Sequence, residues 1–211
     1  MKNVMGKEIF SSQKEKEDFY NNLYRNQNEA LQRSFLERNS IKDKVISEEI
    51  IPFCLEQKVE SVLDIGSRDG KYPAMFYDAG IKDATATEIT TERLDVVKNI
   101  LISNGYFNIK YLCKDIENST IENYGLIILS DLLEHLEKPL NTWKNCLQHS
   151  RFCYGLVPKE DSWNWSPDHV TRFDEELILK FLSFSKEVIT FKTVNYDAAN
   201  SWFSFLVKGY I

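Results

Sequence analysis

The sequence predicts an α/β protein with a doubly wound, mainly parallel sheet of about seven strands. Short runs rich in β-branched and aromatic residues alternate with helix-like patterns along most of the 211-residue chain. This alternation is typical of parallel strands joined by right-handed helical crossovers, with helices on both faces. The last two runs are only about eight residues apart, too few for a helical crossover. We therefore expect an antiparallel last strand that pairs at one edge of the sheet.

The N-terminal region is predicted to be a helical segment outside the sheet. Apolar residues recur there at multiples of four among charged positions, at Phe19, Leu23, Leu31 and Phe35. This is the period of an amphipathic helix, and it runs over residues 13–37. We therefore predict that residues 1–44 form a helical flank or lid and that residues 45–211 form the main domain.

A second apolar stripe leads from this region to Pro52. It comprises Ile41, Val45, Ile46 and Ile50. Because proline has no backbone N–H and its ring clashes with the preceding turn, we expect Pro52 to kink or end this helix. The expected strands then follow in order at residues 61–65, 84–89, 109–113, 126–130, 152–157, 188–194 and 202–207.

The stretch V-L-D-I-G-S-R-D-G-K-Y, residues 62–72, connects the first expected strand to a helix. In a doubly wound sheet, ligands bind at the carboxyl ends of the strands. Gly66 and Gly70 would let the backbone adopt positive φ and approach a ligand closely, while Gly80 would cap the helix that follows. The turn alone is weak evidence, since an ordinary strand-to-helix connection has the same composition.

Two acidic residues extend this pattern along the sheet. Glu88 ends the second strand about 20 residues after the first glycine, where an acid can accept bonds from both ribose hydroxyls. Asp115 follows the third strand, and its carboxylate could accept a bond from an adenine amino group. For both residues the alternative is a solvated strand end or a helix cap. The pattern indicates an adenosine ligand.

The glycine spacing distinguishes two adenosine ligands. A dinucleotide fold needs G-x-G-x-x-G to seat a pyrophosphate at the helix N-terminus, whereas here position 71 is Lys. Asp64, two residues before the first glycine, would repel a phosphate but suits an ammonium group. S-adenosylmethionine carries an ammonium group and no phosphate, and it is the ligand that the pattern favours.

Together, V-L-D-I-G-S-R-D-G, T-E-I, C-K-D-I and L-S-D-L-L-E-H-L-E-K-P resemble class I, Rossmann-like S-adenosylmethionine-dependent methyltransferases, in particular small-molecule and sugar O-methyltransferases. The resemblance covers about residues 45–211 and implies a seven-stranded sheet with an antiparallel last strand. It implies cofactor contacts from Asp64, Gly66, Ser67, Arg68, Gly70, Glu88, Ile89, Asp115, Ile116 and Ser130. The chain departs from the usual D-x-G-x-G-x-G at Arg68, which replaces the middle glycine.

Residues that act on the methyl acceptor are expected after the fourth and fifth strands. Segments 130–139 and 163–173 contain two of the three histidines of the chain. The second segment resembles the E-H-V-R-F-F element of many small-molecule and sugar O-methyltransferases. We predict His169 as general base and His135 as a second catalytic residue. The alternative for both is structural hydrogen bonding. Trp163 and Trp165 would supply aromatic walls of the acceptor pocket.

The same residues are a candidate metal site. If Asp131 and Glu134 share a helical turn with His135, their side chains face one point, and His169 could approach from the neighbouring loop. Carboxylate and imidazole groups could hold Mg²⁺, Mn²⁺ or a similar divalent ion. A similar ligand set is the metal site of small-RNA 3′-terminal 2′-O-methyltransferases.

The predicted function is therefore S-adenosylmethionine-dependent O-methylation of a small-molecule, sugar or glycan-like acceptor. The alternatives are a metal-dependent RNA 3′-terminal 2′-O-methyltransferase and a cofactor-binding, non-catalytic partner subunit, which Arg68 keeps open. A net charge of −6 gives no general attraction to nucleic acid or to an anionic membrane. No apolar run reaches the ~18–20 residues of a membrane span, and the N-terminus does not resemble a signal peptide. We predict a cytoplasmic protein of undetermined oligomeric state.

Overall fold

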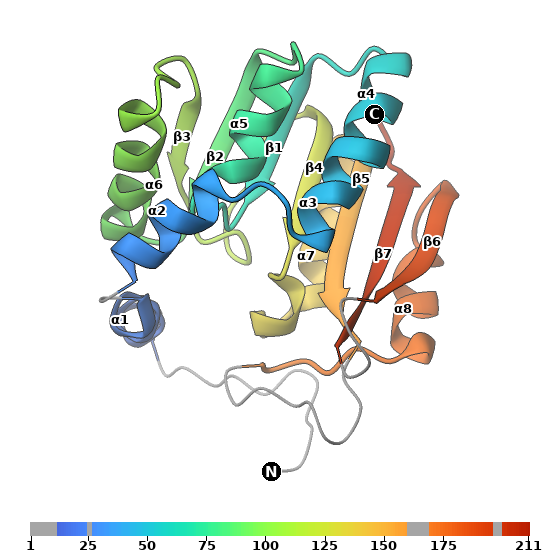
Figure 1. The fold of residues 1–211 in the computed structure, drawn as a ribbon. Helices are drawn as coiled ribbons and strands as arrows, with labels where there is room; N and C mark the ends of the chain where they lie inside the picture. The colour runs from blue at the N-terminus through green and yellow to red at the C-terminus, as the bar shows by residue number, and fades with distance from the viewer. Residues whose placement is uncertain (1–11, 25–26, 160–168, 196–199) are drawn as a thin grey trace. The chain divides into compact units, whose positions relative to one another are not determined.

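The computed structural model describes residues 12–24, 27–159, 169–195 and 200–211 (Figure 1). Its seven strands have the order β3-β2-β1-β4-β5-β7-β6. Strand β7 runs antiparallel to both of its neighbours, whereas β1 and β2, β2 and β3, and β4 and β5 pair in parallel. The predicted fold class is confirmed, including the antiparallel pair at one edge and the N-terminal helices. Among the described helices, none combines the length and the apolar character that a membrane crossing needs.

The described chain divides into two compact units, within Phe10–Asp115 and Ile116–Ile211. The first contains the parallel strands β1 (Ser61–Ile65), β2 (Asp83–Glu88) and β3 (Lys110–Cys113). Its helices are α1 (Gln13–Tyr24), α2 (Asn28–Leu36), α3 (Ile41–Val45), α4 (Ile51–Glu56), α5 (Lys71–Asp78) and α6 (Thr91–Ser103), with the π-helical segment η1 (Ile46–Ile50) between α3 and α4. Because Ile65 lies opposite Thr87 and Glu88 opposite Cys113, the carboxyl ends of these strands share one edge.

The helical segment before β1 differs from the prediction. Helix α4 begins at Ile51 and continues to Glu56, so Pro52 does not end the helix. The Ile51 N–H bonds to the Ile46 carbonyl, the wider spacing of a π-helix. This extra residue places Pro52 in the first turn of α4, where a missing N–H is tolerated.

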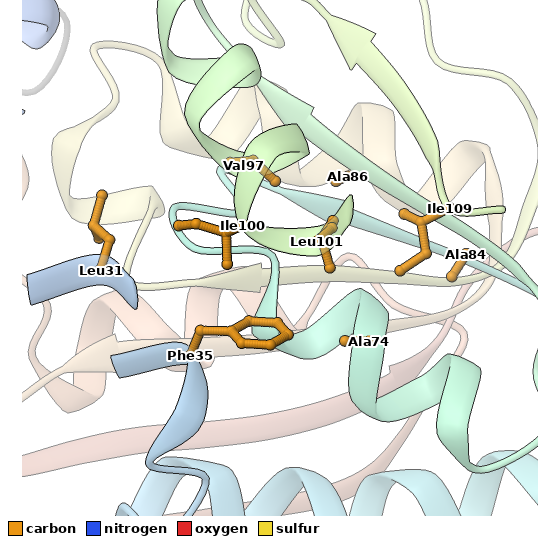
Figure 2. Packing of buried hydrophobic residues seen from close by; sticks show 9 residues of the cluster. All are labelled: Leu31, Phe35, Ala74, Ala84, Ala86, Val97, Ile100, Leu101 and Ile109. Atoms are coloured by element: carbon orange, nitrogen blue, oxygen red, sulfur yellow. The ribbon is translucent and has the colours of Figure 1, made fainter. Parts of the chain in front are cut away.

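One hydrophobic cluster joins helices and sheet in the first unit (Figure 2). Ala84 and Ala86 of β2 present small side chains, and larger ones from the helices pack against this face. The cluster comprises Leu31 and Phe35 of α2, Ala74 of α5, Ala84 and Ala86, Val97, Ile100 and Leu101 of α6, and Ile109. The predicted amphipathic spacing of Leu31 and Phe35 thus marks buried positions, and α2 belongs to this core. A domain boundary at residue 44 stays a prediction.

The second unit contains β4 (Tyr124–Ser130), β5 (Ser150–Pro158), β6 (Glu187–Asn195) and β7 (Ser201–Lys208). Its helices are the 3-10 turn η2 (Leu133–His135), α7 (Pro139–Gln148) and α8 (Glu175–Leu182). Trp143 of α7 is fully buried, and its Nε1 donates to the Phe181 carbonyl at 2.9 Å. The Asp174 side chain caps α8 by accepting from the Leu177 N–H at 2.8 Å. These contacts fix the chain that follows residue 169.

Candidate functional site

The turn after β1 is tied to β2 by hydrogen bonds. The N–H groups of Gly66 and Ser67 both donate to the Thr87 carbonyl at 3.0 Å. The Ser67 hydroxyl donates to the Asp64 carbonyl at 3.0 Å and accepts from the Thr87 N–H at 3.2 Å. The path of the turn is therefore fixed by the protein itself.

Three residues of this turn have left-handed backbone conformations. The φ angles are 74° at Gly66, 56° at Arg68 and 76° at Gly70. A Cβ atom at Gly70 would lie 2.8 Å from Leu101 Cδ1, so glycine is needed there both for conformation and for contact with α6. Arg68, which replaces the middle glycine, has a left-handed conformation, at a cost of roughly 1–2 kcal/mol for a non-glycine residue. Its side chain is exposed.

Glu88 stands at the end of β2 beside this turn. Its Oε1 accepts from the Arg68 N–H at 2.6 Å and lies 3.9 Å from Arg93 Nη2. Burial raises the pKa of Glu88, while Arg93 and the N–H groups of Arg68 and Ile89 act in the opposite direction. The half-buried Ile89 thus touches the candidate site through its backbone.

Asp64, at 3 % exposure, is a second buried acid at this edge. Burial raises its pKa to about 7, and the carboxyl groups of Asp69 and Glu88 add to this effect. Asp69 is itself turned toward the Lys71 N–H, which donates to its Oδ1 at 3.0 Å. A cationic ligand group near these acids would favour their ionised forms.

Asp115 follows β3 and is contacted by the N-terminal helix α1. Its Oδ1 lies 3.3 Å from Lys16 Nζ, and the two side chains are 9 % and 6 % exposed. Nearby along the same edge, the Thr90 hydroxyl donates to Asn21 Oδ1 at 2.8 Å. Sequence reasoning missed Lys16 and Asn21, because the amphipathic pattern of α1 marks apolar positions and says nothing about polar contacts.

The remaining predicted residues belong to the second unit. Ile116 is buried, and Ser130 is half-buried at the end of β4, where it pairs with Leu156 of β5. Trp163 and Trp165 lie outside the described residues.

Asp131 does not share a helical turn with Glu134 and His135, contrary to the prediction. Its φ is 49°, and its N–H donates to the Leu156 carbonyl at 2.8 Å. The left-handed residue turns the chain before η2 begins, so the i, i+3 spacing does not apply. Asp131 Oδ1 instead accepts from Trp202 Nε1 of β7 at 3.0 Å, a contact that the sequence did not indicate.

Glu134, His135 and His169 form a compact group, which we call the histidine cluster. Their candidate ligand atoms lie within 4.8 Å of one another. The two imidazole rings meet edge to face, with centroids 4.7 Å apart, and Glu134 is 1 % exposed. The Glu134 carbonyl accepts from the N–H groups of Val170 at 2.7 Å and Thr171 at 2.9 Å. These two bonds hold the chain after His169 against η2.

The donor set of the histidine cluster bears on the predicted metal. Among the described residues, the group consists of two imidazoles and one carboxylate, without Asp131. Such a set is typical of Zn²⁺ and of the later transition metals, whereas Mg²⁺ prefers oxygen ligands. The cluster can also act without a metal, because imidazole accepts a proton near neutral pH.

Comparison with known families and structures agrees with this geometry. Residues 63–151 match the family described as "Methyltransferase domain". This span includes the turn, Glu88 and Asp115, and it includes Glu134 and His135 of the histidine cluster but not His169. No curated protein gives a significant match to the sequence.

Three solved structures illustrate the fold similarity. Magnesium protoporphyrin IX methyltransferase from Synechocystis PCC 6803, with bound SAH, has a TM-score of 0.65 at 11 % identity, over 92 % of this chain and 100 % of that chain. An S-adenosylmethionine-dependent methyltransferase from Clostridium acetobutylicum ATCC 824 has a TM-score of 0.63 at 16 % identity, over 92 % and 98 %. The N-terminal domain of EvdMO1, in the presence of SAH and D-fucose, has a TM-score of 0.61 at 14 % identity, over 78 % and 82 %.

Proposed function

We propose that this chain, as an S-adenosylmethionine-dependent methyltransferase, methylates a hydroxyl group of a small-molecule, sugar or glycan-like acceptor. The observation that carries the proposal is the turn at residues 66–70, where Arg68 adopts a glycine-like conformation and donates its N–H to Glu88. Because the Arg68 backbone adopts a conformation that glycine favours, the replacement is compatible with a turn that binds the cofactor, and the non-catalytic partner subunit stays the alternative. The sugar-like acceptor is supported by fold similarity to EvdMO1, whose N-terminal domain was crystallised with D-fucose present.

For the cofactor we propose one role for each acid of the first unit. Asp64 would attract the ammonium group, Glu88 would accept from the ribose hydroxyls, and Asp115 would accept from the adenine amino group. The backbone of Gly66, Ser67, Arg68 and Gly70 would follow the methionine part, with Ile89, Ile116 and Ser130 as further contacts. When bound, S-adenosylmethionine supplies an electrophilic methyl group for in-line displacement, so the protein mainly has to align the acceptor.

For the acceptor we propose His169 as the general base that takes the hydroxyl proton. His135 would hold the His169 ring by the edge-to-face contact at 4.7 Å. A base has to lie within hydrogen-bond reach of the proton that it removes, and the two bonds from residues 170 and 171 to the Glu134 carbonyl keep His169 in place.

We also propose that residues 1–44 include a lid over the adenosine end of the cofactor. Support comes from α1, which contacts the chain after β3 through Lys16 and the chain after β2 through Asn21. Both contacts are polar, so α1 could separate from this edge without exposing a large apolar surface. Cofactor exchange would require that separation.

A second candidate is metal-assisted transfer, including the RNA-terminal reaction. The compact donor set of Glu134, His135 and His169 favours it, and a bound ion would supply Lewis acidity at the acceptor oxygen. The comparisons give no support for a metal, and the net charge of −6 does not favour an RNA acceptor. Metal analysis of the purified protein distinguishes metal-assisted transfer from transfer without a metal. Zn²⁺ or Mn²⁺ that raises the melting temperature of the wild type, but not of His135→Ala, would favour this candidate.

The first experiment for the main proposal is calorimetric titration with S-adenosylhomocysteine, and with NAD as the control ligand. We expect micromolar or tighter binding of the first, loss of this binding in Glu88→Ala, and no binding of NAD. Transfer of a labelled methyl group from S-adenosylmethionine to pools of hydroxylated small molecules and glycans then identifies the acceptor class. Tight binding with no transfer to any pool would favour a non-catalytic role.

A further inference from the structure

Arg93 is a buried cation in the first turn of α6, and no motif in the sequence assigns it a role. The Thr90 hydroxyl caps this helix by accepting from the Arg93 N–H at 3.2 Å. The guanidinium Nη2 lies 3.9 Å from Glu88 Oε1, and the two side chains are 6 % and 7 % exposed. The cation is therefore enclosed beside the end of β2.

This position is electrostatically costly for α6 by itself. A helix N-terminus carries a partial positive charge, so a cation in the first turn is unfavourable. Removing a guanidinium from water is strongly unfavourable unless an anion compensates it. The Glu88 carboxylate at 3.9 Å is a compensating anion, so the effect of Arg93 and that of Glu88 have to be considered together.

The other groups that face Glu88 act on its ionisation in both directions. From the turn, Asp69 raises the pKa of Glu88, and Glu88 in turn raises the pKa of the neighbouring Asp64 of β1. The N–H groups of Arg68 and Ile89 lower its pKa, and Arg93 has the largest lowering effect. From α1, the Lys16 ammonium is paired with Asp115. Arg93 thus opposes the combined effect of burial and of Asp69 on the pKa of Glu88.

We infer that Arg93 is a positioning residue for the cofactor, because its guanidinium holds Glu88 as an ionised carboxylate with one oxygen directed to the turn. An ionised carboxylate can accept from both ribose hydroxyls, whereas a protonated one has a hydroxyl group that donates. Loss of Arg93 would raise the pKa of Glu88 further and so favour its protonated form. The inference rests on the proposed function and assigns a new residue to the same site.

The experiment is a titration with S-adenosylhomocysteine between pH 6 and pH 9, for the wild type, Arg93→Met and Arg93→Lys. We expect Arg93→Met to bind at least tenfold more weakly at pH 7 and to recover affinity as the pH rises. Arg93→Lys should stay within about threefold of the wild type, because it keeps a cation beside the Glu88 carboxylate. Far-UV circular dichroism and thermal unfolding of each variant report whether it is folded.

Two results would overturn the inference: a folded Arg93→Met with the wild-type pH profile, or a loss of affinity equal at every pH, which indicates a merely structural pair. Carbon-13 NMR of the Glu88 carboxyl group in the free protein provides a readout without cofactor. Its pKa should rise in Arg93→Met and return in Arg93→Lys. If the wild type failed to bind S-adenosylhomocysteine at any pH, the proposed function would fail, and this NMR shift would still decide whether Arg93 sets the ionisation of Glu88.

Discussion

The turn after β1 and the histidine cluster after β4 are held together by different kinds of interaction. The turn is held by backbone hydrogen bonds, with Gly66 and Ser67 both bonded to the Thr87 carbonyl, and its acids are buried. The histidine cluster is made of side chains from two separate segments, and its histidines are half-buried. The first arrangement suits a ligand that never changes, and the second suits chemistry whose partner has to enter and leave. The comparison predicts that substitutions in the two regions affect different measured quantities.

The largest expected effect is on turnover, from His169→Ala in the histidine cluster. Loss of a general base lowers kcat by about 10²–10⁴-fold, while the affinity for S-adenosylhomocysteine should stay within about twofold. Steady-state kinetics and calorimetry measure the two quantities. The matched control is His149→Ala, since His149 bonds Asn123 at 3.1 Å in an exposed position and should leave both unchanged. If His169→Ala lost cofactor affinity but kept its turnover, the histidine cluster would not have the separate role that the comparison predicts.

Next in size is the effect of Gly70→Ala in the turn. The new Cβ would stand 2.8 Å from Leu101 Cδ1 at a φ of 76°, so we expect a loss of about 2–4 kcal/mol in the free energy of unfolding. Cofactor affinity should fall with it. Urea denaturation provides the measurement. Gly80→Ala is the control, because Gly80 has a φ of 104° with no atom within 4 Å of the added Cβ, so only the conformational cost remains. Equal losses would show that contact with α6 is unimportant.

The effect of pH on cofactor affinity is expected to be smaller. It tests the ionisation of the buried acids beside the turn. Burial raises the pKa of Asp64 from 3.8 to about 7, so below pH 7 the free protein holds a proton that an ammonium ligand has to displace. Affinity should be constant above about pH 7 and fall by up to tenfold for each pH unit below it. Glu88 also has a raised pKa, and Asp64→Asn therefore has to be titrated in parallel. If Asp64→Asn keeps the full decrease of cofactor affinity below pH 7, the proton that the ligand displaces belongs to Glu88 instead.

The smallest expected effect comes from Arg68→Gly. Glycine adopts the φ of 56° without steric cost, so the variant should gain up to about 1 kcal/mol in the free energy of unfolding, after the entropy of glycine in the unfolded chain is subtracted. Guanidinium denaturation measures this change. A clear destabilisation would mean that the exposed arginine side chain makes a contribution larger than its backbone strain.

The two regions also differ in how far the sequence predicts them. All seven strands were predicted to within about two residues, because alternation and β-propensity are local signals. Glu88 and Asp115 follow from the position of strand ends in a parallel sheet. Asp131 was assigned to a helical turn because spacing alone does not reveal a left-handed residue. Arg93, Lys16 and Trp202 contact partners that are distant in the sequence or outside any motif, so no local pattern marks them.

The contact between Gly70 and α6 also determines how the turn opens. A Cβ added at Gly70 would meet Leu101 and Val97, two members of the hydrophobic cluster of Figure 2, so the turn lies directly on this cluster. The Gly70 N–H donates to the Ser67 carbonyl at 2.9 Å. Local opening would therefore uncover core side chains. The Gly70 amide should exchange with deuterium only as often as the whole unit unfolds, which makes this single amide a reporter of global stability.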